Sequence, residues 1–138
     1  MNQTLYLLEF QDIYESSPPE SKEKFLQLYV SRIKNPLLAV GLTLYFGLLG
    51  INRFYVGDTL LGVFKLLALI CGSTLLALHL LYPDYLILAY FSSTATFGVL
   101  AWTYVELFLI GNDVRQKNLD AAREIRTSLV AETIWHRW

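Results

Sequence analysis

Residues 36–111 form a stretch from which charged side chains almost disappear. The five that remain are Arg53, Asp58, Lys65, Asp84 and Glu106. An apolar stretch this long cannot be a single buried helix of a small soluble domain, since about 20 apolar residues already cross a bilayer. The stretch is therefore predicted to be membrane-embedded, between an amphipathic N-terminal tail, 1–35, and an amphipathic C-terminal helix, 112–138.

The composition narrows the possible functions further. The chain is 54% hydrophobic and 17% charged, and its formal net charge is -1, so no basic field favours nucleic acid. Its single cysteine, Cys71, lies in an apolar run and has no internal disulfide partner. The first residues lack the basic start of a signal peptide, so we expect the N-terminal tail to be retained.

The N-terminal tail reads as two short elements. Residues 1–15 favour an amphipathic helix, although a strand over residues 4–10 fits almost as well. The Ser16-Ser17-Pro18-Pro19 break then predicts a new helix, with Ser17 as N-cap and Glu20 completing a capping box. This helix places an apolar face, formed by Phe25, Leu28, Tyr29 and Ile33, either on lipid headgroups or against a partner protein.

Three apolar runs divide the central stretch, at about 36–52, 59–82 and 85–111. The second and third are long enough to span a bilayer, and the turn between them is flanked by tyrosines, which favour the membrane boundary. The first run is short and rich in glycine. We therefore predict an all-α fold: an integral membrane helical hairpin plus a short Gly-rich first membrane helix, flanked by amphipathic helices.

Small residues give the two hairpin helices a packing surface. Ala68 and Gly72 are four residues apart on one helix, and Ser93 and Ala95 lie on the other. Small side chains let helices approach closely in lipid, where packing drives association. Counted from the turn, Gly72 is level with Ala95, so we expect the two patches to meet.

Lys65 and Glu106 are the charges that lie within the long runs. Their depths differ by about one helical turn, roughly 6 Å, which a lysine side chain can bridge. Charges in a membrane are costly when unpaired, which favours an ion pair between them, with or without Arg53. Two separate snorkelling side chains and an ion or proton pathway are the alternatives.

The C-terminal helix carries aromatic anchors. Trp135 and Trp138 bracket a His-Arg pair and suit a headgroup surface or a protein pocket, and Trp102 is a third candidate interface anchor. Lysines and arginines are missing from the 82–85 turn and plentiful in the tails, which predicts a cytoplasmic C-terminal tail in an inner or plasma membrane. The basic N-terminal tail favours the same side, which requires residues 36–52 to be re-entrant or a tilted half-span; otherwise this tail lies outside.

The segment Gly47-Leu-Leu-Gly50-Ile-Asn-Arg-Phe-Tyr-Val-Gly57, followed by Gly62-Val-Phe-Lys65-Leu-Leu, resembles the TM-two (two-transmembrane) domain family of small membrane proteins. Its boundary motif here is Arg53, Phe54, Tyr55 and Gly57. The run from Trp102 through Glu106 to Asn118 is similar to the family's exit into a basic tail. Asn52 replaces the usual Asp or His, Glu106 replaces Asp, and the segment between Leu66 and Trp102 is longer.

The resemblance implies a non-enzymatic membrane module. Catalytic, cofactor-binding and metal-binding residues are not expected, because motifs such as Gly-x-Ser-x-Gly and metal-ligand spacings are absent from the sequence. The favoured function is a membrane adaptor that contacts the lipid bilayer and either self-associates as a homo-oligomer or holds a membrane-associated protein partner through its tails. The alternatives are a subunit of an oligomeric pore or transporter, and a membrane-bound immunity or regulatory partner of a toxin or secretion component.

Overall fold

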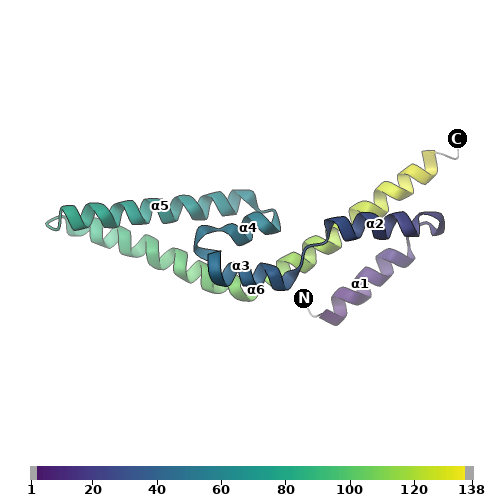
Figure 1. Ribbon diagram of the computed structural model, residues 1–138, viewed down its shortest axis with the longest axis horizontal. Helices are drawn as coiled ribbons and strands as arrows, with labels where there is room; N and C mark the ends of the chain where they lie inside the picture. The colour runs from purple at the N-terminus through teal and green to yellow at the C-terminus, as the bar shows by residue number, and fades with distance from the viewer. Residues whose placement is uncertain (1–2, 136–138) are drawn as a thin grey trace. The chain divides into compact units, whose positions relative to one another are not determined.

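The computed structural model describes residues 3–135, and no strand occurs among them (Figure 1). About 90% of the structure is helical, which confirms the all-α prediction. Contacts within the chain divide it into two compact units. We call residues 36–111 the membrane unit, and residues 1–35 together with 112–138 the tail unit.

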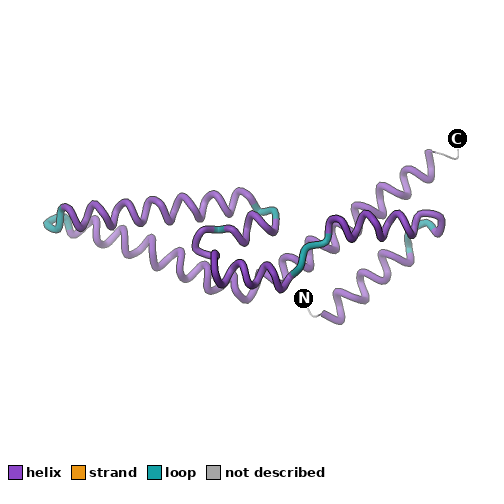
Figure 2. Tube along the Cα trace, viewed as in Figure 1, coloured by secondary structure: helices purple, strands orange, loops and turns teal. Residues whose placement is uncertain are grey.

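Within residues 3–135, eight helical elements follow one another, joined by the short connections drawn in teal in Figure 2. They are α1 (Gln3–Glu15), the 3-10 turn η1 (Pro19–Ser21), α2 (Lys22–Arg32), α3 (Pro36–Phe46), the 3-10 turn η2 (Gly47–Leu49), α4 (Ile51–Val56), α5 (Thr59–Leu81) and α6 (Leu86–Trp135). The segment 1–15 is thus a helix where it is described, and not a strand.

Two of these helices, α5 and α6, are long and apolar enough to cross a membrane. In each, 17% of the most apolar window is buried by the rest of the protein. A core helix of a soluble protein would be mostly covered, so this exposed apolar surface fits lipid as the surrounding solvent. The apolar side chains of α3 are exposed as well. These exposed apolar helices indicate that the chain is a small integral membrane protein.

The expected helix over residues 36–52 is wrong as a single element. α3 ends at Phe46, η2 follows, and the chain turns at Gly50 before α4 begins. Gly50 has a left-handed φ of 73°, and a Cβ there would lie 2.8 Å from the carbonyl oxygen of Gly62. Only glycine fits both the backbone angle and the close approach to α5, which is why the helix breaks here.

Positions along α6 measure how far α3 and η2 extend into the membrane unit. A Cβ on Gly111 would contact Val40 of α3, and a Cβ on Gly47 would contact Thr103. The eight residues between those two levels of α6 rise by about 12 Å, less than half of the ~30 Å hydrocarbon core. α4 then returns to the level of Glu106. α3 and η2 therefore run beside less than half of the bilayer-spanning length of α6 before the chain turns back.

α6 continues without interruption from the membrane unit into the tail unit. The expected boundary between two helices at Gly111-Asn112 is absent, because both residues lie inside one 50-residue helix. Glycine and asparagine only weaken a helix, whereas proline would break it.

The tail unit has a core built from both ends of the chain. It is formed by Ile13, Phe25, Tyr29, Leu119, Ala122, Ile125 and Leu129, from α1, α2 and the end of α6. The Tyr6 and Tyr29 hydroxyls share a hydrogen bond of 2.6 Å within it. The apolar face of α2 is therefore largely covered by the chain itself.

The expected capping box at Ser17 is wrong. The Ser17 hydroxyl donates to the Ile13 carbonyl at 2.9 Å, so it closes α1. α2 starts after η1, with Ser21 at its N-cap position and no side-chain cap. Two prolines hold the backbone of this turn, which leaves the serine available to the preceding helix.

Both ends of the tail unit are also linked by polar contacts. Lys24 pairs with Glu132 at 2.7 Å, and Arg123 pairs with Glu9. The Asn118 side-chain amide accepts from the Lys34 backbone N–H at 3.0 Å and donates to the Lys34 carbonyl at 2.8 Å. This last pair fixes the chain just before it enters α3.

Candidate functional site

α4 is a short helix held between two glycines. Gly50 begins it and Gly57 ends it, and both have left-handed φ angles, 73° and 99°. The backbone N–H groups of Gly57 and Asp58 both donate to the Arg53 carbonyl, which closes the helix after six residues. The two bends leave α4 free to turn its second and third residues, Asn52 and Arg53, into the membrane unit.

The carboxylate of Glu106 collects four hydrogen-bond donors. Oε1 accepts from Arg53 Nε at 2.7 Å and from Trp102 Nε1 at 2.6 Å. Oε2 accepts from Lys65 Nζ at 2.5 Å and from Asn52 Nδ2 at 2.9 Å. We call these five residues the Glu106 cluster. The ammonium of Lys65 and the carboxylate of Glu106, which the sequence analysis expected to pair, thus lie together.

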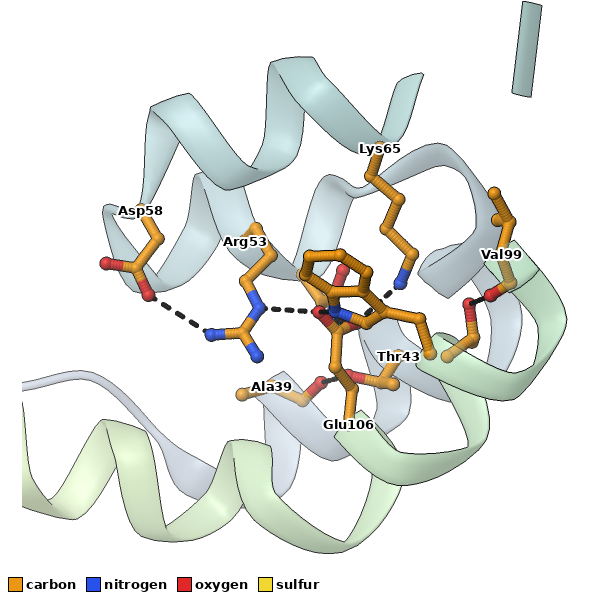
Figure 3. A network of polar contacts seen from close by, with 10 residues as sticks. Ala39, Thr43, Arg53, Asp58, Lys65, Val99 and Glu106 are labelled. Atoms are coloured by element: carbon orange, nitrogen blue, oxygen red, sulfur yellow. Dashed lines mark hydrogen bonds and ion pairs between the residues drawn. The ribbon is translucent and has the colours of Figure 1, made fainter. Parts of the chain in front are cut away.

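The cluster is buried and balanced in charge. Lys65, Glu106 and Asn52 are at most 2% exposed, and Arg53 is 8% exposed. Arg53 also reaches Asp58, at 3.2 Å from Nη1 to Oδ2, as Figure 3 shows. Two cations therefore face two carboxylates. Pairing of this kind offsets much of the cost of removing the charges from water.

The contacts indicate that the Glu106 cluster has a structural role. Its members come from α4, α5 and α6, so one carboxylate joins α4 to both long helices. Each carboxylate oxygen already accepts two hydrogen bonds, which uses its strongest acceptor positions. This arrangement is suited to fixing helices in place.

One polar atom in the cluster has no partner. Asn52 is fully buried and its Nδ2 is bound to Glu106, whereas Oδ1 has no hydrogen bond. A buried acceptor without a partner costs about 1–3 kcal/mol. The amide of Asn52 therefore stabilises the cluster by less than its hydrogen bond alone suggests.

The boundary motif occupies the bend between α4 and α5. Arg53 enters the cluster, and the ring of Phe54 lies against Gly62 of α5, about 3.0 Å from where a Cβ would be. Tyr55 is half-buried. Gly57 supplies the left-handed bend. The motif thus forms the bend between α4 and α5 and places the Arg53 guanidinium in the Glu106 cluster.

The small-residue contact between the hairpin helices involves a different serine from the expected one. A Cβ on Gly72 would lie 3.3 Å from that of Ala95, so these two helices approach closely at this level. Ser92 is buried and donates to the Gly72 carbonyl at 3.3 Å, whereas Ser93 is exposed. Ala68 is half-buried on the same side of α5. The small-residue pattern thus identified the level of the contact, and Ser93 lies about 100° around the helix from Ser92, away from it.

The three expected tryptophan anchors have different environments. Trp102 binds Glu106, so its indole N–H serves the cluster, although part of its ring is exposed. Trp135 is 81% exposed. Trp138 lies outside the described residues. Asn52 and Trp102 are the cluster members whose hydrogen bonds to the carboxylate the sequence analysis missed.

Metal ligands do not gather anywhere in the described part of the chain: no group of three His, Cys, Asp or Glu residues is placed to hold an ion between residues 3 and 135. The carboxylates of Asp58 and Glu106 are both engaged by Arg53.

Comparison with known protein families matches part of the chain. Residues 32–81 match the family model of the TM2 domain, a segment that includes α3, α4 and α5 and ends before Trp102 and Glu106. No curated protein and no solved structure matches the chain. The resemblance to the TM-two domain family is therefore confirmed, and residues 32–81 are the part of the chain that carries it.

Proposed function

We propose that this protein is a non-enzymatic membrane adaptor. In this proposal the membrane unit anchors the chain, and the tail unit offers a preformed helical surface to a partner protein. The observation that carries it is the shared core of the tail unit, in which Phe25 of α2 packs with Ile125 of α6 although the whole membrane unit separates them in sequence. The packing of both tails into one unit supports a topology in which the two tails share one side of the membrane.

The outer surface of α1 supports a docking role. Leu5 and Leu8 are about three-fifths exposed, and they are one turn apart on the helix. Asp12 continues this side of α1 one turn further on and is exposed as well. Exposed leucines next to an acidic side chain are typical of a surface that binds an amphipathic, basic partner segment.

The Glu106 cluster favours an adaptor over a pore or transporter subunit. A carboxylate that accepts four hydrogen bonds from its own chain is held as a structural joint, whereas a conducting site must release its contacts as ions pass. Liposome flux that depends on Lys65 and Glu106 would support the pore instead.

A photo-crosslinking amino acid at position 8 tests the adaptor. When this amino acid replaces Leu8, we expect one defined adduct in intact membranes. When it replaces Thr127, an exposed polar residue of α6 in the same unit, we expect no adduct. Leu5→Asp should remove the adduct from position 8 without unfolding the tail unit, since Leu5 is exposed. The mass of the adduct separates self-association from a second protein, including a toxin or secretion component. The same product from both positions, or no product, would overturn the proposal.

A further inference from the structure

α2 carries an apolar stripe that the core of the tail unit does not cover. Leu26 and Val30 are one helical turn apart on α2 and exposed, Val30 by 69%, and Ile33, the C-cap residue directly after the helix, is exposed as well. They lie beside the buried face formed by Phe25 and Tyr29. The apolar surface of this helix is therefore wider than the core requires, which is typical of a helix that faces a second apolar phase.

The position of the stripe in the chain identifies that phase. Ile33 is three residues before Pro36, where the membrane unit begins. Three residues of extended chain span at most about 10 Å. Ile33 is thus tethered within about this distance of the first residue of the membrane unit, and its neighbour Lys34 is fixed by two hydrogen bonds to Asn118.

The charges at this end of α2 complement a lipid surface. Arg32 lies in its last turn and Lys34 follows, whereas the acidic residues of this segment, Glu20 and Glu23, are at the opposite end. Arg32 keeps half of its side chain exposed while it pairs with Glu124 at 3.5 Å. Cations beside exposed apolar residues are the pattern of helices that lie in a membrane interface.

We propose that Leu26, Val30 and Ile33 form a lipid-contacting surface that rests in the headgroup layer of the leaflet that the chain enters at Pro36. α2 then has two apolar sides: one closes the core of the tail unit, and the other contacts lipid. This surface is separate from Leu5 and Leu8 of α1, so it does not depend on the proposed partner.

An environment-sensitive probe on the full chain tests the proposal. In a Cys71→Ser background, Val30→Cys and Ser31→Cys are each labelled with a nitrobenzoxadiazole dye and reconstituted into phosphatidylcholine vesicles. The two positions share the same depth along α2 but point about 100° apart. Both are exposed, so labelling leaves the core intact.

The expected result is stronger quenching by a shallow doxyl-labelled lipid at position 30 than at position 31, by at least about twofold. Adding phosphatidylglycerol should increase quenching at position 30, and Arg32→Gln should reduce that increase. Equal quenching at both positions would overturn the proposal. So would a probe at position 30 that is shielded from lipid and shows energy transfer between copies, because a second copy would then cover the stripe.

Discussion

The ammonium of Lys65 and the carboxylate of Glu106 are 41 residues apart in sequence and 2.5 Å apart in the structure. The pair is not isolated, because Arg53 Nε lies 2.7 Å from Oε1, the other carboxylate oxygen of Glu106. The pair is therefore part of a joint among three helices, and its removal should affect the fold of the whole membrane unit.

We predict that Glu106→Ala lowers the free energy of unfolding by about 3–5 kcal/mol, since it leaves two buried cations facing one remaining carboxylate. The double variant Lys65→Ala/Glu106→Ala should lose less, because one of those cations is removed. Thermal unfolding in detergent, followed by circular dichroism, compares the two. Equal losses would contradict the prediction, because they would show that Lys65 without its carboxylate partner carries no penalty. Glu132→Ala, which breaks an exposed pair with Lys24, is the control and should cost under about 1 kcal/mol.

The unpartnered oxygen of Asn52 makes a second prediction possible. Asn52→Leu has a similar volume and removes one hydrogen bond to Glu106 together with the buried acceptor that has no partner. The two effects oppose each other, so the free energy of unfolding should change by less than about 1 kcal/mol. Trp102→Phe loses a donor without that compensation and should cost about 1.5–3 kcal/mol. A larger loss for Asn52→Leu than for Trp102→Phe would contradict this account.

The contact between Gly47 and Thr103 predicts a clash with a specific rescue. A Cβ at position 47 would lie 2.6 Å from Thr103 Cγ2, the methyl group of a β-branched side chain. Gly47→Ala should therefore destabilise the protein by about 1–3 kcal/mol. Thr103→Ser removes that methyl group and keeps the hydroxyl, so the double variant should recover most of the loss. Gly41→Ala is the control, because a Cβ there meets nothing within 4 Å.

Tyr29 predicts a loss of stability at alkaline pH. Burial and the hydrogen bond to Tyr6 raise the pKa of the Tyr29 phenol well above its ordinary value. The folded state thus favours the neutral phenol, and this contribution is complete below about pH 10 and is lost as the pH rises further. Melting temperatures measured between neutral pH and pH 11 should fall less steeply for Tyr29→Phe than for the unchanged protein. Identical slopes would contradict the prediction.

Cysteine labelling from each side of the membrane tests the topology. Single cysteines replace Glu20, Thr127 or Asp84 in a Cys71→Ser background; all three positions are exposed. Positions 20 and 127 lie in the tail unit and should react from the same side, which we expect to be cytoplasmic, since the 82–85 turn carries no lysine or arginine. Position 84 should react from the opposite side. Reaction of positions 20 and 127 from opposite sides would rule out the re-entrant segment.

The spanning helices could be predicted from the sequence because length and apolarity alone decide them, as in α5. The pairing of Lys65 with Glu106 could also be expected, since counting residues from the turn gives their depths. The break at Phe46 could not, because it depends on how closely Gly50 approaches Gly62, a contact distant in sequence. Nor could the role of Trp102: an indole suits an interface as well as a carboxylate, and only the folded helix aims its N–H.

The shared core of the tail unit sets an order for biosynthesis. α1 and α2 leave the ribosome first, yet the residues that cover Phe25, from Leu119 to Leu129, are made after both spanning helices. Until then the newborn chain displays an uncovered aromatic surface that chaperones and proteases can recognise. The packing of the tail unit is therefore a late step in folding, which follows the synthesis of both long apolar helices.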